Sequence, residues 1–213
     1  MKKYVLALAL VCCFTLGYSY QTGDTILGLG VVYSPLELGT DWGEVNVEDE
    51  TAHISHDAKL GHPGVGGEIQ ALYFVHPRVA AGLAFEDQVF SNDLSSGWYV
   101  NTTTRHRNFM AVGRYYLTPE SAYKVYVPFA VGVVRGDMTI NFSPKEHFRY
   151  TGFAYHAGLG VERLFGKHWG TGFEVRYNGN RFHDSKTISN GDHVVIYPRA
   201  NYVSGVLRVL YLI

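Results

Sequence analysis

The stretch YTGFAYHAGLGVERLFGKHWGTGFEVRY, residues 150–177, decides the fold of this chain. Its first arm, residues 153–162, places aromatic and aliphatic side chains at every second position, with Gly, His and Glu between them. The second arm, residues 169–178, repeats the alternation, and a tight Phe-Gly-Lys-His turn joins the two arms. A period of two indicates β-strands, because successive side chains leave opposite faces of a pleated chain. The stretch therefore predicts an antiparallel hairpin with one apolar face.

The face opposite the apolar one indicates what surrounds this hairpin. In a soluble β-sandwich that face carries Lys, Ser and Thr and meets water. Here it carries Gly mixed with Glu and Arg, while aromatic residues gather near the ends of the apolar rows. This combination is typical of a barrel whose outer surface meets lipid and whose interior holds the polar side chains.

The first residues of the chain predict an exported protein. Two lysines at positions 2 and 3 precede an apolar run, residues 4–16, and small residues precede position 20. This pattern predicts a cleaved signal peptide at residues 1–19 and one barrel domain at residues 20–213. The run is shorter than the roughly 20 residues that a membrane-spanning helix needs. Both cysteines lie in this segment, so the mature chain would contain no disulfide. An exported soluble protein remains an alternative at this point.

Composition excludes two classes of protein. A formal net charge of -1, with 17% charged residues, provides no basic surface for nucleic acid. A mean hydropathy of -0.04 is too low for a helical membrane protein, whereas barrels often have such values because half of each strand is polar.

Periodicity predicts eight strands of about ten residues, the length that tilted transmembrane strands need. They begin near residues 24, 64, 79, 105, 125, 150, 169 and 203. We expect long loops at residues 36–63, 91–104, 136–149 and 178–196, and short turns at residues 75–78, 118–123 and 165–168. Alternating long and short connections predict an all-β, eight-stranded antiparallel up-and-down transmembrane β-barrel with short periplasmic turns and long extracellular loops.

The residues opposite the apolar rows predict an ion-paired interior. Four acids and three bases face one narrow space, where unpaired ions would be costly and which side chains alone can fill. We expect a closed interior, with a gated proton or ion path as the alternative. The network consists of Glu68, Glu86, Arg114, Glu162, Glu174, Arg176 and Arg208.

Aromatic residues lie near both ends of the outward rows, where lipid headgroups favour them. They predict two aromatic girdles. The members are Tyr73, Phe85, Phe109, Tyr115, Phe153, Trp169, Tyr177 and Tyr211.

Three segments resemble the superfamily of small outer-membrane barrels that includes OmpA, OmpX and the opacity-type proteins. They read GLAFE at residues 82–86, YYLTPESAYKVYVPFAVGVV at 115–134 and AGLGVERLFGKHW at 157–169. The resemblance implies a monomer in the outer membrane of a Gram-negative-type bacterium, with a structural or adhesive role and no cofactor. It also implies contact with outer-membrane lipid or lipopolysaccharide, insertion by the barrel assembly machinery, and loops that meet an extracellular ligand. The ending Tyr-Leu-Ile departs from the terminal Phe of such proteins.

Two alternatives place chemistry in the loops. The sequence RFHDS, residues 181–185, is similar to the His-x-Ser element of PagL-type lipid A deacylases. That resemblance would make Ser185 the nucleophile, His183 the base and Asp192 the acid, although Lys186 stands where the family has Asn. The second alternative is a metal site in an acidic loop. Three histidines there have imidazole groups that could bind zinc, copper or nickel: His53, His56 and His62.

Overall fold

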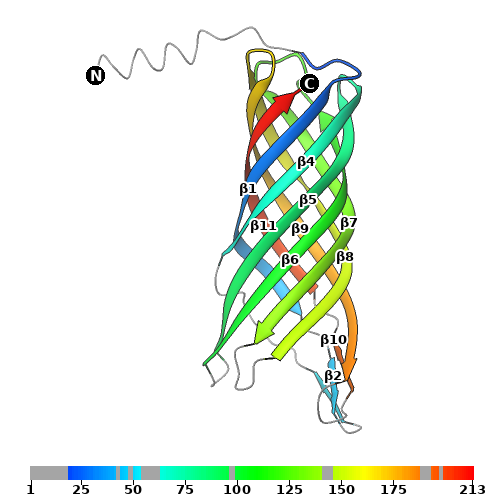
Figure 1. The fold of residues 1–213 in the computed structure, drawn as a ribbon, viewed down its shortest axis with the longest axis vertical. Helices are drawn as coiled ribbons and strands as arrows, with labels where there is room; N and C mark the ends of the chain where they lie inside the picture. The colour runs from blue at the N-terminus through cyan, green and yellow to red at the C-terminus, as the bar shows by residue number, and fades with distance from the viewer. Residues whose placement is uncertain are drawn as a thin grey trace, which may run out of the picture.

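Eight long strands form a closed antiparallel barrel (Figure 1). The computed structural model describes residues 19–41, 44–47, 50–53, 63–95, 99–140, 146–187, 193–196 and 199–213. The barrel order is β9-β11-β1-β4-β5-β6-β7-β8, and pairing of β8 with β9 closes it. The barrel strands are β1 (Thr25–Asp41), β4 (Gly64–His76), β5 (Val79–Ser95), β6 (Tyr99–Tyr116), β7 (Lys124–Ile140), β8 (Glu146–Phe165), β9 (Trp169–Thr187) and β11 (Arg199–Leu212). The predicted eight-stranded antiparallel barrel is confirmed.

Three short connections lie at one end of the barrel, which we call the turn end. They are residues 77–78 between β4 and β5, residues 117–123 between β6 and β7, and residues 166–168 between β8 and β9. Gly166 has a φ of 71°, in the left-handed region that glycine adopts without a Cβ clash. β1 begins and β11 ends at the same end, where Ile26 pairs with Leu212. The other connections contain residues outside the described ranges.

Three short strands lie near the opposite end, which we call the far end (Figure 1). β2 (Glu44–Val47) pairs with β3 (Glu50–His53), and β10 (His193–Ile196) pairs with the last residues of β9. The segments that contain these strands, residues 36–63 and 178–196, were expected to be loops, and that expectation is wrong for these residues.

The barrel strands are also longer than predicted, at 13 to 20 residues. β5 and β6 pair as far as Ser95 and Tyr99, and β1 and β11 pair as far as Asp41 and Arg199. Parts of the expected loops at residues 91–104 and 136–149 are therefore strand. Once the barrel sets the register, each further residue adds a ladder hydrogen bond, which outweighs the low strand propensity of Asn, Asp and Ser.

The two faces of each strand differ in character. In β4 and β11, buried and exposed residues alternate along almost the whole strand. The buried set faces the interior, and most of the large apolar side chains face outward. Among the described residues, no helix is long and apolar enough to cross a membrane.

Candidate functional site

Seven carboxylate and guanidinium side chains of the described residues project into the barrel interior from six strands. Each of them is at most 2% exposed, because every second residue of a barrel strand points inward. The seven are the residues that strand alternation places inside: Glu68, Glu86, Arg114, Glu162, Glu174, Arg176 and Arg208.

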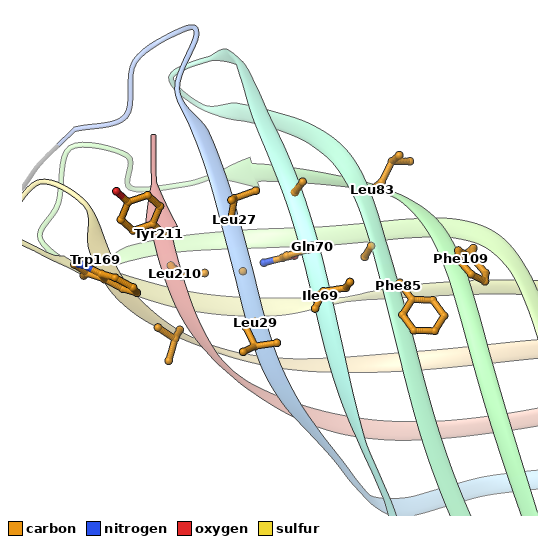
Figure 2. A pocket seen from close by; sticks show the side chains of 14 residues that line it. Leu27, Leu29, Ile69, Gln70, Leu83, Phe85, Phe109, Trp169, Leu210 and Tyr211 are labelled. Atoms are coloured by element: carbon orange, nitrogen blue, oxygen red, sulfur yellow. The ribbon is translucent and has the colours of Figure 1, made fainter.

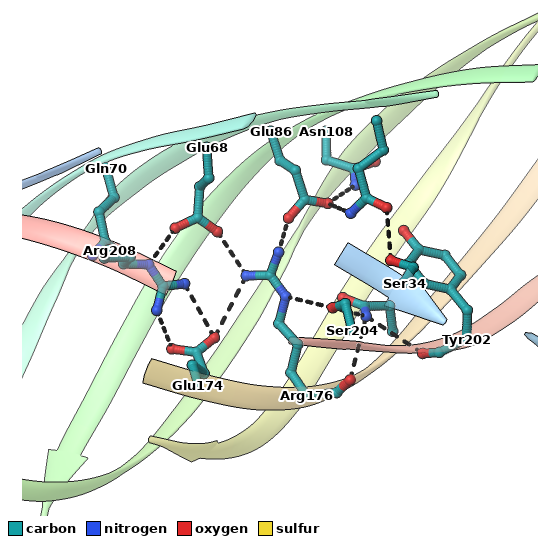
Figure 3. A network of polar contacts seen from close by, with 12 residues as sticks. Ser34, Glu68, Gln70, Glu86, Asn108, Glu174, Arg176, Tyr202, Ser204 and Arg208 are labelled. Carbon is teal, nitrogen blue, oxygen red and sulfur yellow. Dashed lines mark hydrogen bonds and ion pairs between the residues drawn. The ribbon is translucent and has the colours of Figure 1, made fainter. Parts of the chain in front are cut away.

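Arg176 is the centre of this network (Figure 3). Its Nη1 donates to Glu68 Oε2 at 2.6 Å and lies 3.5 Å from Glu174 Oε1. Its Nη2 forms an ion pair with Glu86, and its Nε donates to Ser204 Oγ at 3.2 Å. One guanidinium group therefore contacts three carboxylates.

The other two arginines extend the network toward the turn end. Arg208 donates from Nε to Glu68 at 2.6 Å and from Nη1 to Glu174 at 2.8 Å (Figure 3). Arg114 donates to Glu162 at 3.0 Å and lies 3.8 Å from Glu174. Glu174 is thus shared by all three arginines, and each carboxylate of the interior has a cationic partner.

Two side-chain amide groups also donate hydrogen bonds to Glu86. Gln88 Nε2 donates to Glu86 Oε1 at 2.6 Å, and Asn108 Nδ2 donates to the same oxygen at 2.9 Å. Ser34 Oγ donates in turn to Gln88 Oε1 at 3.0 Å (Figure 3). Sequence analysis did not assign Gln88 or Ser204 to the network, although both lie at the strand parity that identified Glu86 and Arg208.

Tyr20 and Lys124 close the network at the turn end. The Tyr20 hydroxyl donates to Glu162, and its ring lies 5.1 Å from the Lys124 ammonium. Lys124 is buried and donates to the carbonyl of Pro119 at 2.7 Å and to that of Ser121 at 3.0 Å. Sequence reasoning missed Tyr20, because residue 20 precedes the first strand and has no period of two to place it.

An aromatic layer seals the interior at the turn end. The Tyr20 and Phe74 rings stack with centroids 4.3 Å apart, and Tyr116 lies 5.3 Å from Phe74 and 5.4 Å from Tyr126. Gly160 leaves room for the Tyr126 ring, since a Cβ at that position would lie 2.2 Å from a ring carbon. These rings are almost completely buried.

A second aromatic layer lies toward the far end. The Tyr150 and Phe182 rings meet edge to face with centroids 4.5 Å apart. Phe90 lies 5.1 Å from the His106 ring and 5.3 Å from the Tyr202 ring. The ion-pair network therefore lies between two layers of packed rings.

This arrangement favours a structural use of the interior charges over a chemical one. Each of the four interior carboxylates lies within ion-pair distance of at least one arginine. Ion pairs without access to water are costly to break once they are formed. The interior therefore resembles a packed core.

The outer wall carries a shallow groove of about 690 Å³ (Figure 2). Trp169 and Tyr211 border it on one side, and Phe85 and Phe109 border it on the other. Aliphatic side chains lie between these aromatic pairs, and Leu29 among them is 65% exposed. The groove is mostly apolar and lies on the outer wall of the barrel.

The eight aromatic residues expected in girdles all lie at outward positions of the barrel wall. Trp169 and Tyr211 pack with centroids 4.9 Å apart near the turn end, and Phe85 and Phe109 pack at 4.7 Å farther along. Seven of the eight are exposed and Phe85 is half-buried. The exposed members are Tyr73, Phe109, Tyr115, Phe153, Trp169, Tyr177 and Tyr211.

The residues of the two alternative loop sites lie largely outside the part that the structure describes. His183 and Ser185 belong to β9, where Ser185 pairs with Val195 of β10, but their side chains are not described. Asp192 lies outside the described residues, as do His56 and His62. His53 belongs to β3, and its side chain is not described either. Neither site is assembled by the described residues.

Solved structures of bacterial surface proteins share this architecture. The outer membrane protein OprG from Pseudomonas aeruginosa matches with a TM-score of 0.58 over 92% of this chain and 98% of its own, at 11% sequence identity. This chain has the fold of the small eight-stranded outer-membrane β-barrels. Ail, the attachment invasion locus protein of Yersinia pestis, matches this outer-membrane barrel fold with a TM-score of 0.51 over 91% of the chain and 100% of its own, at 12% identity. No protein-family model and no curated protein match the chain.

Proposed function

We propose that this chain is an integral outer-membrane protein with a structural or adhesive role and a closed barrel interior. In this proposal its interactions take place at the far end, which faces the outside of the cell. The turn end faces the periplasm, as short turns do in outer-membrane barrels.

The outer wall supports the membrane location. Large apolar side chains cover it on every barrel strand, and Leu83 at 70% is the most exposed of them. An apolar belt of this extent on a soluble monomer would cause aggregation. In a bilayer the same belt meets acyl chains, and the outward aromatic residues would lie at the two headgroup layers.

The packing of the interior is the observation that supports the rest of the proposal. The three arginines and four glutamates are buried between the two aromatic layers. A barrel of eight strands has little space beyond its own side chains, so this interior offers no route for solutes. The activity of such a barrel is therefore confined to its outer surfaces and its loops.

The adhesive part of the proposal has further support in the strand lengths. β8 has 20 residues, about twice the number that a tilted strand needs to cross the bilayer. Strands of this length would carry the far end beyond the membrane surface, where it could meet other molecules. Ail, which shares the fold, is an attachment protein by its name.

Planar bilayer recordings test the closed interior. We expect the purified, refolded barrel to produce no stable conductance steps above those of the bare membrane, because rings and ion pairs fill its interior. An open porin refolded in the same lipid is the control. Reproducible steps from the wild-type chain would overturn the closed barrel.

Cell fractionation tests the location. In a Gram-negative host, we expect the chain in the outer-membrane fraction, with a gel mobility that shifts when the sample is boiled. We also expect the purified protein to have the mass of residues 20–213, as the predicted cleavage requires. Recovery in the soluble periplasmic fraction without a mobility shift would contradict the membrane location.

A further inference from the structure

Four arginines gather on the outward face of the wall, on β6, β7 and β8 near the far end. Arg107 and Arg135 are direct cross-strand partners of β6 and β7. Arg105 lies two residues along β6 from Arg107, and Arg149 pairs across the β7–β8 ladder with Asp137. We call these four residues the arginine cluster.

Two aspartates neutralise part of this cluster. Asp87 accepts from Arg105 Nε at 2.8 Å. Asp137 lies 3.1 Å from Arg107 Nη1 and 3.4 Å from Arg149 Nε. Among the side chains that the structure describes here, four guanidinium groups thus share two carboxylates, an excess of two positive charges.

Arg135 has no carboxylate partner within the described part of the chain. It is exposed, and no described Asp or Glu forms an ion pair with it. Its direct partner in the sheet is Arg107, another cation. Like charges directly opposite each other destabilise a sheet, whereas a bound anion between them would remove that repulsion.

The height of the cluster on the wall indicates where such an anion would lie. Arg107 is two residues beyond Phe109 on the same outward face, and Arg135 is two residues beyond Val133. Two residues advance a strand by about 7 Å, or about 5 Å along the membrane normal at a tilt of about 45°. The headgroup layer on each side of a bilayer is about 5–7 Å thick. On the outward faces of β6 and β7, Arg107 and Arg135 are thus the first charged residues after the apolar rows, where the apolar wall would give way to the headgroup layer.

One border of the groove on the outer wall reaches β6, the strand that carries Arg105 and Arg107. Phe85 and Phe109 border the groove, and each lies two residues from a charged residue of this region, Asp87 and Arg107 respectively. A ligand with an anionic head and hydrocarbon chains could therefore place its head at the arginines and a chain along the apolar wall below them.

We propose that the arginine cluster is a binding site for the phosphate groups of a phosphorylated glycolipid of the outer leaflet, whose acyl chains lie along the groove wall. This inference rests on the outer-membrane location proposed above. Arginine suits the role, because its planar guanidinium binds phosphate oxygens in pairs. A sulfated polysaccharide would use the same charges but would leave the apolar wall unused.

Native mass spectrometry of the refolded barrel in detergent tests the site. The probes are bisphosphorylated lipid A and the same lipid with both phosphates removed. We expect the bisphosphorylated lipid to bind at least about tenfold more tightly than the dephosphorylated one, and the double variant Arg107→Gln/Arg135→Gln to lose that preference. The control, Arg78→Gln/Lys167→Gln, removes two exposed charges at the turn end and should bind like the wild type.

Three results would overturn the site. They are equal binding of the two lipids, unchanged preference in the double variant, or displacement of the lipid by a heparin oligosaccharide or inorganic phosphate at equal concentration. Because binding is measured on refolded protein, it is independent of targeting in cells. A wild type that binds the lipid but fractionates with the periplasm would contradict the proposed location alone.

Discussion

Replacing Arg176 with methionine is expected to lower the free energy of unfolding by about 3–5 kcal/mol. The methionine side chain fills much of the same space but leaves Glu68 and Glu86 without the guanidinium that now contacts both. A buried carboxylate without a cation is far more costly than the pair was favourable. Urea titration of the barrel refolded in lipid vesicles, followed by tryptophan fluorescence, measures the change.

Two further variants separate loss of charge pairing from loss of packing. Glu68 keeps its contact with Arg208, so Glu86 is the carboxylate left without a cation; adding Glu86→Gln to Arg176→Met removes that charge, and the double variant should regain part of the lost stability. Arg105→Gln, on the exposed outer face, is the control for loss of one arginine and should leave the urea midpoint unchanged. An Arg176→Met protein as stable as the wild type would show that the interior pairs contribute nothing to the fold.

Sequence periodicity was sufficient to predict the barrel, because the side chains of a barrel strand point alternately into the barrel and away from it. An inward residue follows an outward one, so Glu174 and Arg176 could be placed inside from the neighbouring Phe173 and Val175 alone. The same rule covers Gln88 and Ser204, which were missed because neutral polar residues did not stand out among the charged ones.

The ends of the strands could not be predicted in the same way. Residues 91–95 read Ser-Asn-Asp-Leu-Ser, a composition typical of turns, yet they pair with residues 99–103 of β6. Local preference favours a loop there, and the ladder already formed by residues 79–90 extends the strand. Tyr20 is a similar case, because its place in the interior follows from contacts with Phe74 and Glu162, which are distant in sequence.

The arginine cluster and the ion-pair network use the same residue type for different purposes. Arg176 is buried among carboxylates, so its charge is compensated within the barrel. Arg135 faces outward beside another arginine, so its charge is available to a ligand. The position of each of these two arginines along its strand, inward or outward, therefore decides whether its charge is compensated inside the barrel or faces outward.

Replacing Leu83 with arginine is expected to destabilise the membrane-inserted barrel by about 2–4 kcal/mol. Leu83 lies in the middle of the apolar belt, paired with Ala71 and Ala111 on the adjacent strands, and is 70% exposed. In a lipid bilayer the new charge would face hydrocarbon. On the surface of a soluble barrel, the same substitution would change stability by no more than about 0.5 kcal/mol.

Ser91→Arg provides the matched control for this prediction. Ser91 is exposed on the same face of β5, eight residues farther along and beyond the apolar belt. An arginine there would lie in water or among headgroups, so it should leave the free energy of unfolding in vesicles unchanged. Both variants place an arginine on the outward face of β5 at different depths, so the difference in their stability reports the environment of the wall at Leu83. Equal stability of the two proteins in vesicles would mean that Leu83 does not face lipid, and the membrane location would then have to be abandoned.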